Sequence, residues 1–266
     1  SLSDTAYLAV DLLKHLPAGH ALAAEWLPRI ASGNARISLA HPVNLLTADA
    51  ENADLLLLWH KDEVHALKPS QAKLTTNESI DMSRRLARVE WTPSAASLVC
   101  DATSGRAIWA DVVNRAGLAL ASQLVGLASR MLDLGVDHAA QRKQFGKPVG
   151  SFQAVKHHLA DVAVKIEFAR PVVFRAAYAM QKNDPLRAVH VSHARLAAGE
   201  AARLAARRSI QVHGAMGYTW EADLQMFMKR AWALDASWGD RAFHKTRVAQ
   251  HVLAGEAALG PAATFS

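Results

Sequence analysis

The chain of 266 residues is 51% hydrophobic and 20% charged, and 30 basic against 24 acidic residues give a formal net charge of +6. This content of apolar side chains excludes an intrinsically disordered chain and is sufficient for a sizeable core. The one cysteine, Cys100, excludes a disulfide framework and any zinc site made of several cysteines. His190 and His193 are only three residues apart and no HExxH motif is present, so we expect no metal site.

Membrane insertion and nucleic-acid binding are not expected from this sequence. The longest run without a charged residue, 116–129, is shorter than the roughly 20 apolar residues that cross a bilayer. The first residues lack the basic region that opens a signal peptide, so we expect a cytoplasmic protein. The basic residues are scattered, without a zinc finger or a basic tract interleaved with aromatic residues, which argues against a nucleic-acid partner.

The first 105 residues predict two short helices followed by a small β-domain. Residues 1–34 include helical patterns at 8–16 and around 20–30, and we treat them as residual N-terminal helices. Residues 35–105 carry short β-like runs joined by polar segments, of which 60–63 has the length of a hairpin connection. These runs predict a reduced, mostly antiparallel β-domain, with strands at 36–40, 55–59, 64–67, 87–92 and 97–100.

Residues 106–266 predict an antiparallel helical bundle, so the fold class is mainly α with a small β-domain. Long helices are expected at 108–141 and 152–180, and the second carries apolar residues that step by three and four along one face. Pro171 predicts a kink or a break in that helix. Asp184-Pro185 has the pattern of a helix start, and a last helix is expected at 240–253.

Two segments could carry chemistry. The first, 142–148, reads RKQFGKP at a corner between two helices, where Arg142 offers a planar group of five donors suited to a pyrophosphate and Phe145 could stack on a flat ring. Alternatively, it is a helix end that Gly146 terminates. The second segment, 211–221, has small residues through which backbone N–H groups could approach an anion, or it is a helix end followed by a turn.

Together these segments resemble the C-terminal helical domain of the acyl-CoA dehydrogenase family. The resemblance rests on RKQFGKPVGSFQ and QVHGAMGYTWE, with FARPVVFRAAYAM and MFMKRAWAL in the expected places, and covers residues 108–250. WLPRIASGNARISLA and MSRRLARVEW look like remnants of the middle β-domain of that family. In the family, the adenosine end of the FAD of one subunit is held by the neighbouring subunit.

The resemblance implies which residues of this chain contact FAD. Arg142 would lie on the pyrophosphate, Phe145 against the adenosine, and Gln153 on the same half of the cofactor. The phosphate side would also be contacted by Gln211 and by the backbone of Val212, His213, Gly214 and Ala215. Ala215 replaces the usual second glycine, a small change that we expect the site to tolerate.

The reacting end of the family site is altered. In most members a glutamate follows the basic pair by about nine residues and removes the α-proton, for which it must lie within hydrogen-bonding reach. Here that position falls on Trp238-Gly239-Asp240, and the position used by other members falls near Ala116. Asp240 is either a displaced base or, more simply, the N-cap of the last helix. We therefore assign no catalytic residue.

Two further parts of the family pattern are changed. The loop of glycines and hydroxyls that lies along the flavin ring is replaced by residues 38–45, SLAHPVNL. The N-terminal helical domain is largely absent. The family motifs that bind the adenosine and pyrophosphate of FAD are kept, while the motifs around the flavin ring and the catalytic base are lost.

These losses favour the catalytically depleted subunit of an α2β2 acyl-CoA dehydrogenase. Its partner would be an unlike dehydrogenase subunit that binds the acyl-CoA, with electron-transfer flavoprotein as the electron acceptor. Some such pairs act on steroid side-chain CoA thioesters. Two alternatives stay open: a complete homo-oligomeric dehydrogenase with Asp240 as its base, and a helical scaffold without enzymatic activity.

The remaining conspicuous residues are assigned structural roles. The spacing of Arg195, Arg203 and Arg207 predicts a solvated or subunit-facing helix surface. Trp220 and Trp232 are expected in core or interface packing. The histidines are expected at the surface or at helix caps.

Overall fold

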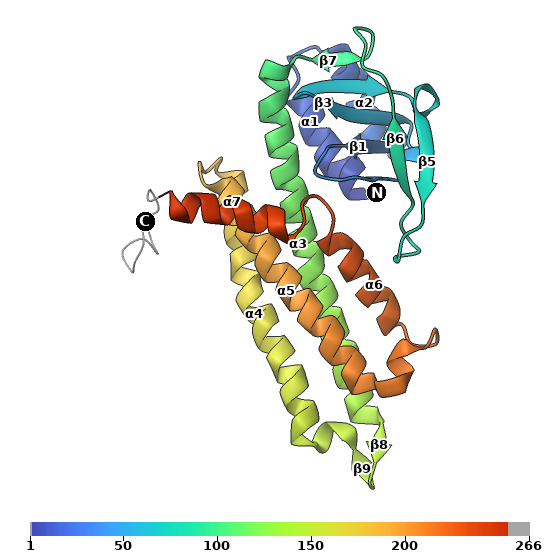
Figure 1. The fold of residues 1–266 in the computed structure, drawn as a ribbon, viewed down its shortest axis with the longest axis vertical. Helices are drawn as coiled ribbons and strands as arrows, with labels where there is room; N and C mark the ends of the chain where they lie inside the picture. Colours follow the sequence, from blue (N-terminus) through green and yellow to red (C-terminus); the bar gives the residue numbers. More distant parts are fainter. Residues whose placement is uncertain (1, 255–266) are drawn as a thin grey trace. The chain divides into compact units, whose positions relative to one another are not determined.

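The computed structural model describes residues 2–254 and divides into two compact units, 1–119 and 120–266. Unit 1 contains short helices and two small sheets, and unit 2 is helical apart from a small two-stranded hairpin (Figure 1). The long helix α3 (Ala102–Gln141) contributes its first part to unit 1 and the rest to unit 2. The structure therefore confirms a mainly helical chain with a small β part.

Unit 1 opens with a π-helical stretch, η1 (Asp4–Ala9), that continues into α1 (Val10–Lys14). The predicted helix at 8–16 is thus present and begins earlier. Thr5 joins it to the first strand, because its Oγ1 accepts the N–H of Ile37 at 2.9 Å. The second predicted helix is α2 (Ala21–Ala31), and His20 is its N-cap, since its Nδ1 accepts the N–H of Leu22 at 3.3 Å.

The strands of unit 1 form two sheets. The first has the order β1 (Ile37–Ala40), β3 (Leu55–His60), β4 (Glu63–Leu67), β7 (Leu98–Cys100), with β1 and β3 parallel and the other pairs antiparallel. The second is antiparallel, in the order β2 (Thr47–Ala48), β6 (Leu86–Glu90), β5 (Lys73–Asn77). Strands lie at all five predicted places. The sequence analysis missed β2, which has two residues, and β5, which is polar and largely exposed.

The connection between β3 and β4 is a two-residue hairpin turn, as the polar segment at 60–63 predicts. Lys61 and Asp62 both have positive φ, 47° and 68°, as a type I′ turn requires. The first turn of α3 lies against this hairpin, because a Cβ at Gly105 would overlap with the carbonyl oxygen of Asp62. Trp109 Nε1 donates to the carbonyl of Glu63 at 3.0 Å, which fixes the helix there.

The interior of unit 1 is built on β3. All four leucines at 55–58 are buried, and Leu56 and Leu58 share a cluster with Ala50, Leu67 and Ala87. A strand buried on both faces reads as a continuous apolar run, which accounts for the sequence LLLL.

The segment 38–45, where the family resemblance implies a flavin-facing loop, forms the end of β1 and a turn. The imidazole of His41 there lies 5.8 Å from the ring of Trp59 and 5.4 Å from that of Trp109. Burial lowers the pKa of His41 to about 4, so the half-buried ring is neutral where it lies beside these two tryptophans.

Unit 2 consists of the rest of α3 with α4 (Gln153–Gln181), α5 (Arg187–His213), α6 (Leu224–Asp235) and α7 (Arg241–Leu253) (Figure 1). The apolar stripe predicted for α4 is buried from Val162 onward. Helix α5 packs against α4, and most of the residues that it buries are small, among them Ala194, Ala198, Ala201, Ala202, Ala205 and Ala206. Small side chains allow the two helix axes to approach closely.

Three boundaries differ from the sequence prediction. Helix α3 starts at Ala102, six residues before the predicted 108. Helix α4 continues through Pro171 without a break. Helix α5 starts at Arg187, because Asp184 accepts the N–H of Leu186 at 2.7 Å in a turn that precedes the helix.

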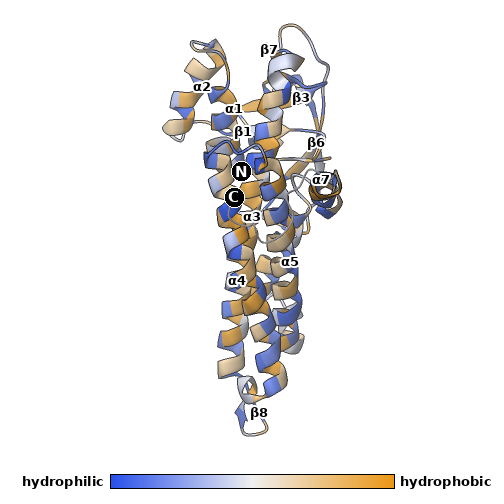
Figure 2. Ribbon diagram, turned by 90° about the vertical axis from the view of Figure 1, so that its left-hand side faces the viewer, coloured by the Kyte–Doolittle hydropathy of each residue, from blue (hydrophilic) through white to orange (hydrophobic). Residues whose placement is uncertain are grey.

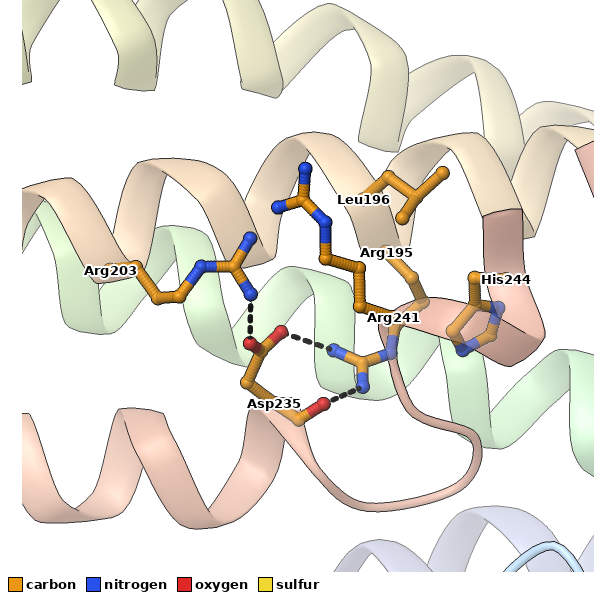
Figure 3. Close-up of a pocket in the computed structure, with 6 residues that line it drawn as sticks. All are labelled: Arg195, Leu196, Arg203, Asp235, Arg241 and His244. Carbon is orange, nitrogen blue, oxygen red and sulfur yellow. Dashed lines mark hydrogen bonds and ion pairs between the residues drawn. The ribbon is translucent and has the colours of Figure 1, made fainter. Parts of the chain in front are cut away.

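The prediction of a solvated arginine surface on α5 is wrong for Arg195, which is 2% exposed. Its Nη2 donates to four carbonyl oxygens at 3.0–3.3 Å, those of Leu234, Asp235, Ser237 and Gly239. These carbonyls belong to the end of α6 and the loop after it, where helix carbonyls lack partners of their own. Arg203 pairs with the Asp235 carboxylate (Figure 3). Arg207 is exposed, as predicted.

Trp220 and Trp232 are 70% and 39% exposed, so neither belongs to the core, and their packing at an interface stays a prediction. Within residues 2–254, no helix combines the length and the apolar character needed to cross a bilayer.

Candidate functional site

The first predicted segment forms a small hairpin after α3. Strands β8 (Lys143–Gln144) and β9 (Lys147–Pro148) pair through a two-residue turn in which Phe145 and Gly146 have φ values of 51° and 76°. Gly146 is therefore a hairpin residue, and the alternative that it terminates α3 is wrong, because α3 already ends at Gln141. Phe145 lies at the tip of the turn and is 89% exposed.

Arg142 lies at the base of this hairpin. Its N–H donates to the carbonyl of His138 at 2.9 Å, which continues the helical pattern by one residue. Its carbonyl accepts the N–H of Val149 at 2.7 Å, which joins the hairpin to the short helix η4 (Val149–Ser151). The backbone of Arg142 is thus fixed on both sides, while its exposed guanidinium remains available for a ligand.

The second predicted segment begins where α5 ends at His213. Gly214 has φ 60° and ψ −140°, a conformation that is essentially restricted to glycine. The chain then forms the 3-10 helix η5 (Gly214–Tyr218), in which Gly217 is buried, and a Cβ there would press on Ile210. Gly214 is required because of its backbone conformation, and Gly217 because a side chain there would not fit.

Both segments line one open cavity of about 520 Å³ in unit 2. Six residues predicted from the sequence are part of its wall: Arg142, Gln211, Val212, His213, Gly214 and Ala215. The structure adds residues that the sequence analysis did not select: His138, Gln144, Val149, Ala154, Val155, His158 and Met216. His138 precedes Arg142 by four residues, one helical turn, and this spacing is the signal that could have found it.

Two predicted residues lie outside this wall. Phe145 packs edge-on against Phe152, with ring centroids 6.2 Å apart. Gln153 is exposed at the first position of α4.

The cavity has the electrostatics of an anion site. It carries one guanidinium and three imidazoles, and none of the wall residues named above is acidic. The pKa of His138 is lowered by burial and, in addition, by the neighbouring His213 and Arg142. A guanidinium without a carboxylate partner among these wall residues, beside imidazoles that can donate hydrogen bonds, favours a negatively charged ligand.

Asp240 acts as the N-cap of α7. Its Oδ1 accepts the N–H of Phe243 at 2.8 Å, and the residue has the extended backbone typical of that position. It is not a wall residue of the cavity. The two positions where the family resemblance implies a catalytic glutamate hold apolar residues. Trp238 is buried and has a φ of 51°, and Ala116 is buried in α3.

A separate group of potential metal ligands lies in unit 1. Asp11, His15 and Asp111 place one ligand atom each within 4.8 Å of one another. The guanidinium of Arg115 offsets the charge of one of the two carboxylates, since its Nε lies 2.6 Å from Asp11 Oδ2.

The model of the acyl-CoA dehydrogenase C-terminal domain matches residues 103–253. The chain belongs to the acyl-CoA dehydrogenase family. The match covers more than half of the chain and includes both walls of the cavity, the hairpin after α3 and the end of α5.

Individual members of the acyl-CoA dehydrogenase family agree with this assignment. Acyl-CoA dehydrogenase IpdE2 of Mycobacterium tuberculosis is 39% identical over 153 residues, which are 58% of this chain and 43% of that protein. The chain thus spans less than half the length of this curated relative.

Solved structures share the fold across nearly the whole chain. A glutaryl-coenzyme A dehydrogenase in complex with glutaryl-CoA has a TM-score of 0.81 at 22% identity and covers 93% of this chain and 73% of its own. The FAD complex of PigA has a TM-score of 0.78 at 17% identity, over 92% of this chain and 74% of its own. These structures therefore share the fold of the β part of this chain as well as that of its helical bundle.

Proposed function

We propose that this chain is a subunit of a flavin-dependent acyl-CoA dehydrogenase and that its helical unit holds the adenosine and pyrophosphate end of FAD for a partner subunit. The observation that carries the proposal is the cavity, in which two segments about 70 residues apart converge without an acidic side chain. FAD, when bound, accepts the hydride that leaves the acyl chain.

The residues of the cavity fit a diphosphate. Arg142 offers a planar fork of donors, and charge-assisted hydrogen bonds from such a fork are shorter and stronger than neutral ones. Gln211 adds an amide, and the positive φ of Gly214 turns the backbone at the end of α5 without a side chain. The substitution Ala215 adds one methyl group to this wall. Phe145 and Gln153, outside the wall, are proposed to contact the adenosine half.

An exposed apolar face on α4 supports a partner subunit. Val164, Phe168, Phe174 and Tyr178 are each more than half exposed. At about 100° per residue they fall within roughly a third of the helix circumference, and Figure 2 shows hydrophobic residues along the length of α4. Exposed apolar groups on one helix face favour an interaction surface, here one that also includes the charged side chains of Glu167 and Arg175. The same helix begins at the cavity, through Ala154 and Val155.

The reacting end is proposed to lie in the partner. The carboxylate of Asp240 is occupied as a cap, and His41 with two tryptophans fills the segment where relatives would face the flavin ring. We therefore place the base and the acyl-CoA in an unlike subunit of an α2β2 assembly in the cytoplasm, with electron-transfer flavoprotein as the acceptor and steroid side-chain CoA thioesters as one substrate class.

Co-expression with an acyl-CoA dehydrogenase encoded beside it tests this proposal. Native mass spectrometry of the product is expected to give two copies of each subunit with bound flavin, whereas the chain purified alone is expected to bind little flavin and to oxidise no acyl-CoA. A lone chain that carries stoichiometric FAD and turns over substrate would overturn the proposal.

Arg142→Ala in the assembled complex tests the site itself. A hydrogen bond to a charged group contributes about 1.5–3 kcal/mol, so FAD is expected to bind roughly 10- to 100-fold more weakly. Arg207→Ala, an exposed arginine on α5 outside the cavity wall, is the matched control and is expected to leave flavin content unchanged.

A further inference from the structure

Two histidines from different helices stack inside the cavity. The rings of His138 on α3 and His213 on α5 have centroids 4.3 Å apart and planes 24° apart. His213 Nδ1 lies 2.8 Å from the carbonyl oxygen of Ser209, so this nitrogen carries a hydrogen and donates it. Its Nε2 is left as the atom that can take up a proton.

The surroundings of His138 disfavour its protonated form as long as no anion is present. The titratable and charged groups around the histidine pair are Arg142 after α3, His158 on α4 and the two histidines themselves; the hairpin contributes uncharged Gln144 to the wall. Burial, His213 and Arg142 all lower the pKa of His138. A bound anion would act in the opposite direction, since a negative charge favours the protonated form of a nearby imidazole.

We propose that the His138–His213 pair makes the binding of phosphates in this cavity dependent on proton uptake. The inference rests on the proposed function, because it takes the ligand to be the diphosphate of FAD. When the diphosphate binds, the pair gains a proton at an imidazole nitrogen, and the doubly charged ligand is matched by two positive groups in place of Arg142 alone. The affinity for the diphosphate therefore rises as the pH falls from the pKa of the histidine pair with ligand bound towards its pKa without ligand. For one proton the rise is up to about tenfold per pH unit.

ADP-ribose is the appropriate probe. Each of its two phosphates has one ester bond to a sugar and shares the anhydride bond, so each keeps a single negative charge near neutral pH and a pH dependence of binding reports on the protein. NMR titration of the chain at about pH 6 and about pH 8 would follow the ring signals of His138 and His213, a range that spans the ordinary histidine pKa. We expect several-fold tighter binding at the lower pH, and a higher pKa of His138 with ADP-ribose than without it.

Two variants distinguish a proton-linked role of His138 from a purely structural role of its ring. His138→Phe keeps a ring against His213 but cannot titrate, so the ratio between the affinities at the two pH values is expected to shrink towards one. His157→Gln alters an exposed histidine that is not a wall residue and is expected to leave this ratio unchanged.

The outcomes distinguish the two proposals. If ADP-ribose binds equally at both pH values and Arg142→Ala still weakens it, the histidine inference is overturned and the proposed function stands. If ADP-ribose shifts no signal of the cavity at millimolar concentration at either pH, and Arg142→Ala leaves the flavin content of the complex unchanged, both are overturned.

Discussion

Asp235 at the end of α6 occupies the space beside Gly199 on α5, where the Cβ of any larger residue would overlap with its Oδ1 atom. Gly199 lies midway between Arg195 and Arg203, four residues from each. Residues at this spacing share one helix face, so the carboxylate is seated between two guanidinium groups (Figure 3). The missing side chain of Gly199 leaves room for the Asp235 carboxylate, and the two guanidinium groups stabilise its charge.

Gly199→Ala is expected to destabilise the protein by about 1–3 kcal/mol, the usual effect of overpacking a close contact. Urea denaturation measures the change. Gly126→Ala is the control, because this exposed helical glycine of α3 has open space around it. There the better helix propensity of alanine is expected to stabilise by up to about 1 kcal/mol. Equal effects at the two positions would contradict the packing argument.

Arg195→Met is expected to cost about 3–5 kcal/mol, because it removes the charge that satisfies the carbonyls after α6 and leaves Asp235 with one partner in place of two. The thermal midpoint and the urea midpoint should both fall. Arg207→Met, on the exposed part of the same helix, is expected to stay within about 0.5 kcal/mol of the wild type. A tolerated Arg195→Met would mean that the loop is held by other contacts.

His244 is expected to make stability fall in acid. Burial, with further contributions from Arg195 and Arg247, lowers its pKa to about 3, below the value of about 6.5 in an unfolded chain. Its contribution is complete above pH 6.5 and is lost as the pH falls towards 3, because only the unfolded state takes up the proton. Between about pH 7.5 and 5 the free energy of unfolding is expected to fall by about 2 kcal/mol. His244→Gln should flatten this part of the pH profile, and the exposed His157→Gln should leave it intact.

Substitutions of Asp240 distinguish its role as the N-cap of α7 from a role as catalytic base. If it only caps α7, Asp240→Asn retains the hydrogen bond to Phe243 and is expected to leave stability nearly unchanged, whereas Asp240→Ala costs about 1 kcal/mol. Neither substitution should lower the turnover of the complex. Loss of activity in Asp240→Asn at unchanged stability would instead favour the homo-oligomeric enzyme.

Phe145 is strained and exposed at the same time. A bulky residue with φ 51° at a hairpin turn is unfavourable, and asparagine is preferred there. Phe145→Asn is therefore expected to stabilise the chain slightly, by up to about 1 kcal/mol, and yet to lower the flavin content of the complex through loss of the ring. If flavin content is unchanged, the proposed contact of Phe145 with the adenosine is wrong.

The sequence by itself determined the family, the positions of most strands and helices, and six wall residues of the cavity. It did so because local patterns carry this information: three-four spacing for α4, short apolar runs for the strands, and the motifs of residues 142–153 and 211–221. Asp240 as an N-cap was also readable, since a cap depends on its own helix alone.

Only the tertiary structure decided what depends on residues far apart in the chain. Arg195 belongs to a helix whose pattern suggests solvent, and its burial follows from the carbonyls some forty residues later that receive its hydrogen bonds. Likewise, His138 and His213 stack across 75 residues of sequence. Neither helix shows this alone, because the energy of such contacts resides in pairs of groups that chain folding brings together.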